Sequence, residues 1–135
     1  MTSTRPRDQR GGSSSVLAAI VAPMLLVLAG LVVDGGGQLA AAREAQAVAA
    51  EAARAGVDAA GPENLGAQFS PVLAQQGAQE YLEQAGVAGT VSVVDGRVTV
   101  RTTITYQTIF VGIVGIHSLD GHGESSARRI RNAPR

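Results

Sequence analysis

The side chains that could do chemistry are few, and the two histidines of the chain lie close together. His117 and His122 flank Asp120 in the segment HSLDGHGE. A His-x4-His spacing with carboxylates nearby could hold a metal ion if a loop brought the ligands together. A structural metal site normally needs four ligands, however, and polar residues on a short returning segment explain the same pattern. We therefore expect no metal site and no bound cofactor.

Other catalytic motifs are missing from the sequence. The chain contains no cysteine, which excludes disulfides, thiolate zinc sites and a cysteine nucleophile. It contains no lysine and hence no P-loop, and it has no Gly-x-Ser-x-Gly nucleophile elbow. Its 11 basic residues are balanced by 11 acidic ones, so general nucleic-acid binding, which depends on neutralising phosphates, is not expected. The sequence thus predicts no catalytic residue, no enzyme activity and no small-molecule substrate.

The apolar residues are concentrated near the N-terminus. The block Val16–Val33 (VLAAIVAPMLLVLAGLVV) carries no charge and contains nothing more polar than Pro23 and Gly30. A helix across this block and the preceding serines would be roughly 30 Å long, the thickness of the hydrocarbon core of a bilayer. We expect a transmembrane helix over residues 13–34 that leaves the membrane at Gly30 and Asp34. Because Asp34 would lie at the interface, a solvated carboxylate is expected rather than a functional one inside the membrane.

Charges on either side of this span indicate its orientation. Arg5, Arg7 and Arg10 precede it and are opposed only by Asp8, and the positive flank of a membrane helix stays in the cytoplasm. We therefore expect a single-pass plasma-membrane protein with a cytoplasmic leader at residues 1–12 and an extracytoplasmic C-terminal part. The alternative is a cleaved signal peptide with an Ala-x-Ala site at residues 40–42, although the 18 apolar residues exceed the usual 7–15.

A second helix-forming segment follows the span. Gly35–Gly37 is expected to weaken the helix at the membrane exit, and residues 35–60 form an Ala-rich helical extension. At about 100° per residue, the charged side chains of this extension fall on one stripe and small residues lie opposite. This helix-packing face consists of Ala45, Ala49, Ala52 and Gly56. Small residues at such spacing permit close backbone approach, either to a neighbouring subunit or to the chain's own sheet through Val98, Val100 and Ile104.

Residues 61–135 are expected to form a small α+β head. Ser70-Pro71 predicts the start of a helix and Gly86 its end. Alternating β-branched residues predict strands at 90–94 and 97–107, joined by a hairpin turn at Asp95-Gly96. The apolar run at 109–116 is too short to span a bilayer, and we expect a short helix that covers the sheet or lies at the membrane surface. A third strand is expected within 117–131.

Several features of the N-terminal third occur in a particular order. A basic leader ends in Arg10-Gly11, Pro23 interrupts the apolar span, Gly30 and Asp34 form a Gly-x-x-x-Asp exit, and an Ala-rich helix follows. In this the chain resembles the TadE/TadG-like proteins of the tight-adherence (Flp) pilus system. The resemblance implies a pilin-like head and a minor pseudopilin or pilus-assembly component that acts by packing rather than catalysis. Its partners would be the lipid bilayer and other pilus or Tad secretion components, or further copies of itself.

The same resemblance raises the question of processing. Pilins and TadE-like pseudopilins are cut after a glycine, typically with a glutamate five residues later. Here the candidate glycines are Gly11 and Gly12, and the fifth residues after them are Val16 and Leu17. In lacking this glutamate the chain resembles TadG-like members of the family, which often lack it as well. Two other functions stay open: a small secreted binding domain released by signal peptidase, and a membrane-anchored accessory subunit of another envelope or secretion machine.

Overall fold

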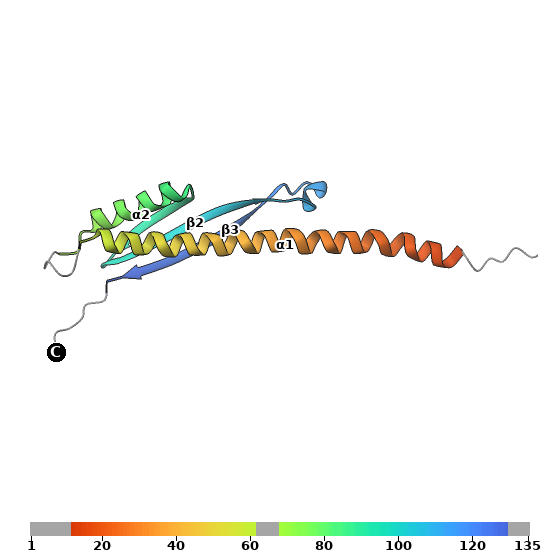
Figure 1. Cartoon of the computed structure of the whole chain (residues 1–135), viewed down its shortest axis with the longest axis horizontal. Coiled ribbons are helices and arrows are strands. Elements are labelled where there is room, and N and C mark those ends of the chain that lie inside the picture. The colour runs from red at the N-terminus through yellow and green to blue at the C-terminus, as the bar shows by residue number, and fades with distance from the viewer. Residues whose placement is uncertain (1–11, 62–67, 130–135) are drawn as a thin grey trace, which may run out of the picture.

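The computed structural model describes residues 12–61 and 68–129. Its elements follow in the order α1 (Gly12–Ala59), α2 (Pro71–Ala85), β1 (Ala88–Val94), β2 (Arg97–Gln107), the short 3-10 helix η3 (Val111–Val114) and β3 (Ser118–Arg128). Figure 1 shows one very long helix with the other elements gathered along the half of it that lies towards the C-terminal end of the helix. The α+β class expected from the sequence is confirmed.

Helix α1 is continuous over 48 residues, which corresponds to about 70 Å at 1.5 Å per residue. It includes Pro23 and passes through Gly35–Gly37 without a break, so the expected weakening at the membrane exit does not interrupt it. Long helix-forming stretches on both sides support the glycines. The apolar span and the Ala-rich extension are therefore two halves of one continuous helix.

Local signals explain helix α2 and the first hairpin. The Ser70 side chain accepts a hydrogen bond from the Leu73 N–H at 3.4 Å, Pro71 occupies the first turn, and Gly86 ends α2 in the left-handed conformation with φ 66°. The β1–β2 turn has positive φ at both Asp95 (49°) and Gly96 (71°), as a tight two-residue hairpin requires. The predicted boundaries of α2 and β2 and the position of the turn agree with the structure.

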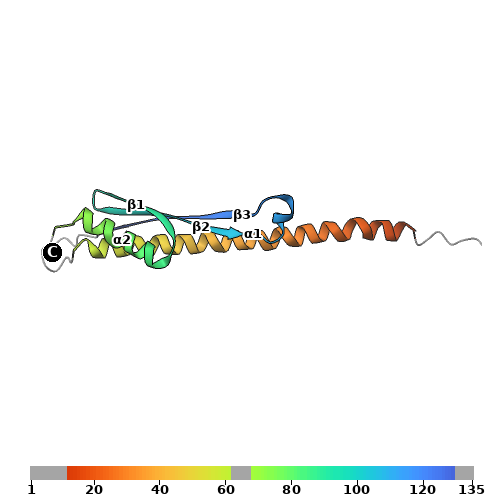
Figure 2. The same ribbon diagram turned by 90° about the horizontal axis from the view of Figure 1, so that it is seen from above.

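The three strands form one antiparallel sheet in the order β1-β2-β3. The sheet and α2 both lie along α1 (Figures 1 and 2). The core between them is built mainly from small residues: Ala49, Ala52, Ala53, Ala60, Ala74, Ala78, Leu82, Val98 and Val100. Because alanine side chains are short, the helices and the sheet come close together, and the head is thin.

The N-terminal half of α1 projects beyond the head. Every residue from 14 to 29 is exposed, including apolar side chains such as Leu25, Leu26 and Val27. Among the described residues, α1 is the one helix long and apolar enough to cross a membrane by length and composition, and almost none of its most apolar stretch is buried. A soluble core helix would be covered on at least one side, whereas the apolar surface of the projecting half is left uncovered by the described part of the chain.

Candidate functional site

Of the three residues considered as metal ligands, Asp120 and His122 lie on β3 with exposed side chains, whereas His117 precedes the strand, at the end of the loop between β2 and β3. The Thr103 hydroxyl lies 3.2 Å from His122 Nδ1, and the Thr105 hydroxyl donates to Asp120 Oδ1 at 2.8 Å. Each of these is a directly opposed pair between β2 and β3. No group of three or more histidine, aspartate or glutamate side chains gathers as a metal cluster within the parts of the chain that the structure describes. These polar residues pair across strands, which is an ordinary way of stabilising a sheet.

A line of small residues runs along the face of α1 that meets the head. The line begins at Gly30, continues through Gly37 and Ala41 with the carboxylate of Asp34 among them, and leads into the helix-packing face of Ala45, Ala49, Ala52 and Gly56. A Cβ added at Gly30 would lie 2.7 Å from Phe110 Cβ, and one added at Gly37 would collide with the Tyr106 ring. The glycines therefore make room for two aromatic side chains of the head.

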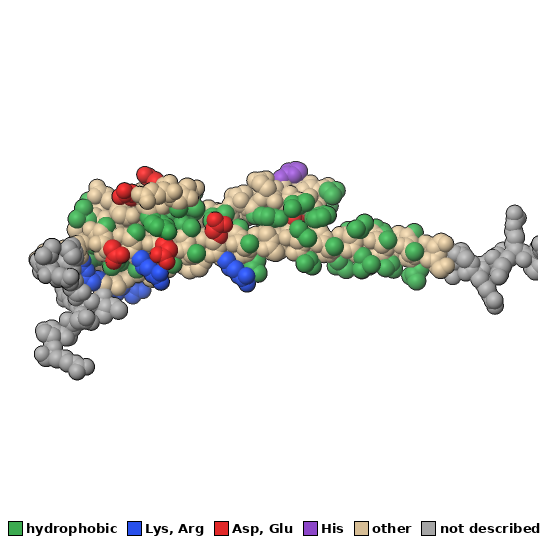
Figure 3. Space-filling view, viewed as in Figure 1, with side chains coloured by type: hydrophobic (Ala, Val, Ile, Leu, Met, Phe, Trp, Pro, Cys, Tyr) green, Lys and Arg blue, Asp and Glu red, His purple; other side chains and the backbone are tan. Residues whose placement is uncertain are grey.

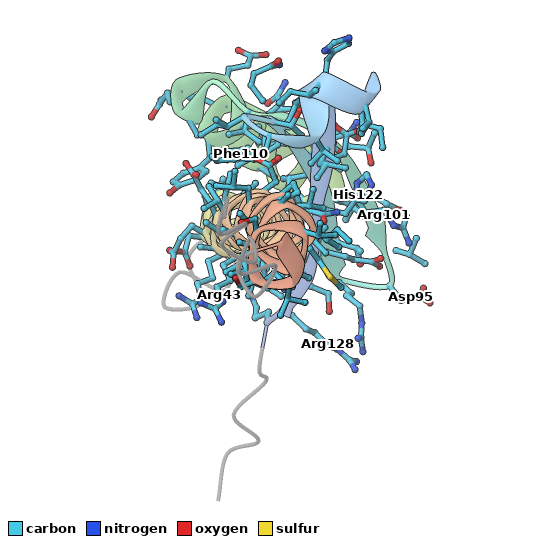
Figure 4. The ribbon with its side chains drawn as sticks, turned by 90° about the vertical axis from the view of Figure 1, so that its right-hand side faces the viewer. Arg43, Asp95, Arg101, Phe110, His122 and Arg128 are labelled. Carbon is cyan, nitrogen blue, oxygen red and sulfur yellow. The ribbon has the colours of Figure 1, made fainter. Side chains whose placement is uncertain are left out.

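Asp34 is the centre of this contact. Its side chain is buried, with the residue only 1% exposed. Asp34 Oδ1 accepts the Ile109 N–H at 2.8 Å, and Oδ2 accepts the N–H groups of Phe110 at 2.9 Å and Val111 at 2.7 Å. A carboxylate that satisfies three consecutive backbone donors holds that stretch of chain in one conformation. In Figure 4, which views the molecule along α1, Phe110 lies between the loop and the helix.

The expectation that Asp34 is solvated was wrong. The interface position alone predicts a carboxylate in water, but the loop between β2 and β3 folds back onto α1 and covers it. The contact joins residues 75 to 77 positions apart in the chain, and nothing in the local sequence around Asp34 indicates it. Burial of the charge is compensated by the three N–H donors, which in turn would otherwise lack a protein partner.

The loop of residues 108–117 is closed by its own backbone. The Thr108 N–H donates to the His117 carbonyl at 3.1 Å, next to the last strand pair Gln107↔Ser118. Gly115 ends η3 with φ 93°, a left-handed conformation that favours glycine. The expected short helix at 109–116 is therefore present as η3. It does not cover the sheet, because the loop turns towards α1 instead.

The helix-packing face is covered by the chain's own head. Ala45, Ala49 and Ala52 are fully buried, and a Cβ added at Gly56 would lie 2.7 Å from the carbonyl oxygen of Ala74 in α2. Of the two surfaces considered for this face, the one seen in the structure is the internal one. Val98 and Val100 belong to the same core cluster.

Sequence reasoning missed the residues on the other side of this contact. Gly121 and Gly123 of β3 lie flat against α1, because a Cβ on either would collide with the helix backbone at Ala41–Ala42 or Ala45. The buried Thr102 hydroxyl donates to the Ala45 carbonyl at 2.7 Å. The available signal was the Gly-x-Gly alternation in the third strand, which places both glycines on one face of the sheet.

Of the two glycines predicted as processing sites, the structure describes only Gly12. Gly12 is the first residue of the helix, and Gly11 falls outside the described residues, as does the rest of the basic leader. The processing prediction at these glycines therefore stays a prediction.

A protein-family model matches the N-terminal part of the chain. Residues 11–60 match the Tad family model, described as Flp pilus-assembly TadE/G-like. The matched segment covers the whole of α1, including the projecting half, Asp34 and the helix-packing face. Comparisons with curated proteins and with solved structures found no match.

Proposed function

We propose that this chain, which carries a TadE/G-like Flp pilus-assembly domain over residues 11–60, is a single-pass plasma-membrane protein that acts as a minor pseudopilin or pilus-assembly component. The observation that carries the proposal is the position of the projecting half of α1. The matched segment contains both the uncovered apolar half of α1 and the half of α1 against which the head packs. Such a protein works by packing against lipid and other subunits, and it needs no catalytic group.

The proposed orientation places the N-terminus in the cytoplasm and the head outside it. Arg5, Arg7 and Arg10 flank the apolar half on one side, and the sheet and α2 lie along the opposite half. The apolar half of α1 therefore lies between the arginine-rich leader and the folded head. The positive-inside rule then favours a cytoplasmic leader and a head on the other side of the membrane.

Release by signal peptidase fits the structure poorly. A cut after Ala42 would remove Asp34, whose carboxylate accepts three N–H groups of the head. It would also remove the backbone of Ala41 on which Gly121 rests. The released head would keep its loop but lose the acceptor for three donors. These contacts favour a mature protein that retains the whole of α1.

The covered face leaves a particular surface for assembly. Because Ala45, Ala49, Ala52 and Gly56 are buried against the head, other subunits would meet the projecting half of α1 and the outer surfaces of the head. The helix-packing face then serves to hold the head against the C-terminal half of α1.

Deletion and complementation in the source organism test the proposal. Cells that lack the gene are expected to lose Flp pili in electron micrographs, and the full-length chain is expected to restore them. A copy tagged in the exposed β1–β2 turn then shows whether the protein is sheared off with the fibres, as a pseudopilin would be, or stays in the membrane, as an assembly factor would. Unchanged pilus number and length after deletion would rule out both roles.

A further inference from the structure

We propose that the loop of residues 108–117 is a second membrane contact, inserted among the lipids of the outer leaflet beside α1. The proposal rests on the membrane anchoring set out above and adds the position of the head relative to the bilayer. The ligand is the lipid bilayer itself, at the boundary between headgroups and acyl chains.

The loop exposes an unusual number of large apolar side chains. Ile109, Phe110, Ile113, Val114 and Ile116 are all exposed, with Ile113 reaching 85%. No charged residue occurs between Thr108 and Ile116. In water, a contiguous apolar surface of this kind is unfavourable and usually marks an interaction site.

The position of the loop along α1 identifies what covers it. Phe110 packs on Gly30, which lies inside the apolar block. Gly30 is four residues before Asp34, so the contact lies about 6 Å further into the span than the carboxylate. The exposed side chains Leu31, Val32 and Val33 of α1 are at the same level. Figure 3 shows hydrophobic side chains on the loop and along the projecting half of α1 beside it. Lipid that surrounds this turn of α1 therefore also meets the loop.

Most backbone N–H groups of the loop already have hydrogen-bond acceptors within the protein, as contact with lipid requires. Of the eight N–H groups from Ile109 to Ile116, three donate to Asp34 and three more, those of Ile113, Gly115 and Ile116, donate to carbonyls of the same loop. The Thr108 hydroxyl also donates to the Ile116 carbonyl. Backbone groups must be satisfied internally before a non-helical segment can enter lipid. Interfacial apolar elements commonly enter about 5–10 Å below the membrane surface, which agrees with the level of Gly30.

Tryptophan fluorescence can measure the depth of the loop, because the chain has no tryptophan of its own. The full-length protein is reconstituted at low density in vesicles of phosphatidylethanolamine and phosphatidylglycerol that contain phosphatidylcholine brominated at shallow or deep acyl positions. Three single variants are compared: Ile113→Trp in the loop, Leu25→Trp in the projecting half of α1, and Val94→Trp at the far end of the head. Leu25 and Val94 are 59% and 62% exposed, so all three sites tolerate a larger side chain.

The expected pattern has three parts. Ile113→Trp is quenched, most strongly by shallow bromines, and emits at shorter wavelength than Val94→Trp. Leu25→Trp is quenched most strongly by deep bromines, and Val94→Trp is not quenched by either lipid. Quenching of Leu25→Trp without quenching of Ile113→Trp would overturn the loop proposal and leave the anchor intact. A blue-shifted but unquenched Ile113→Trp would mean that protein, such as a second copy, covers the loop instead of lipid, and would also overturn it. Failure to quench Leu25→Trp would refute the membrane anchor and the loop together.

Discussion

Ala49→Leu is the most direct perturbation of the contact between α1 and the head. Ala49 is fully buried and belongs to the same core cluster as Ala52, Ala53 and Val98. The space around this cluster is already filled, since a Cβ added at Gly56 would meet Val98 Cγ1 at 3.1 Å. Three extra carbon atoms at Ala49 must therefore push the sheet away from the helix. Overpacking of this kind costs about 1–3 kcal/mol.

Ala47→Leu is the matched control for this substitution. Ala47 lies two residues earlier on the same helix and is exposed, so the same side chain is added with the same helix propensity and no overpacking. For a domain of this size, each 1 kcal/mol lowers the melting temperature by roughly 4–8 °C. We expect scanning calorimetry of the detergent-solubilised full chain to give a melting temperature at least about 4 °C lower for Ala49→Leu than for Ala47→Leu. Limited proteolysis should cut the head of Ala49→Leu first. Equal melting temperatures and equal protease resistance would show that the small face is not a structural contact within the chain, and the packing argument would be wrong.

Three further predictions concern Asp34, Gly56 and the N-terminus. Asp34→Asn removes one of the carboxylate acceptors and places an amide donor among N–H donors, so hydrogen exchange at Ile109–Val111 should accelerate while exchange in β2 stays unchanged; Asp58→Asn, at an exposed position of α1, should alter neither. Gly56→Ala gains about 0.5–1 kcal/mol of helix propensity but presses on the Ala74 carbonyl, so its melting temperature should fall, and a rise would contradict the close approach. The intact mass of the purified protein should correspond to an uncleaved N-terminus or to a cut at Gly11-Gly12, whereas a mass that begins at Arg43 would disprove the anchored form.

The elements that the sequence predicts well are those specified by neighbouring residues. The N-cap at Ser70, the left-handed Gly86 and the Asp95-Gly96 turn each depend on a few adjacent positions, and the structure has all three as expected. The apolar span is similarly evident, because its length and lack of charge are properties of a continuous block.

The features that could not be predicted depend on contacts between distant parts of the chain. Asp34 is buried because a loop about 75 residues later folds over it, and periodicity along α1 carries no information about that loop. Helix α1 continues through Gly35–Gly37 because of the long helical segments on both sides, and the low helix propensity of three glycines does not decide it. The spacing along α1 indicates the small face, but two surfaces fit it equally well, and only its burial against α2 and the sheet distinguishes them.

Labelling of single cysteines tests the central claim that α1 anchors the head outside the cytoplasm. The chain has no native cysteine, so Ser3→Cys and Asp95→Cys each give one reporter, at the leader and at the far end of the head. In spheroplasts treated with a membrane-impermeant maleimide, we expect Asp95→Cys to be labelled and recovered in the carbonate-washed membrane pellet. Ser3→Cys should be labelled only after lysis. Labelling of Ser3→Cys in intact spheroplasts, or recovery of labelled Asp95→Cys in the soluble fraction, would contradict the account.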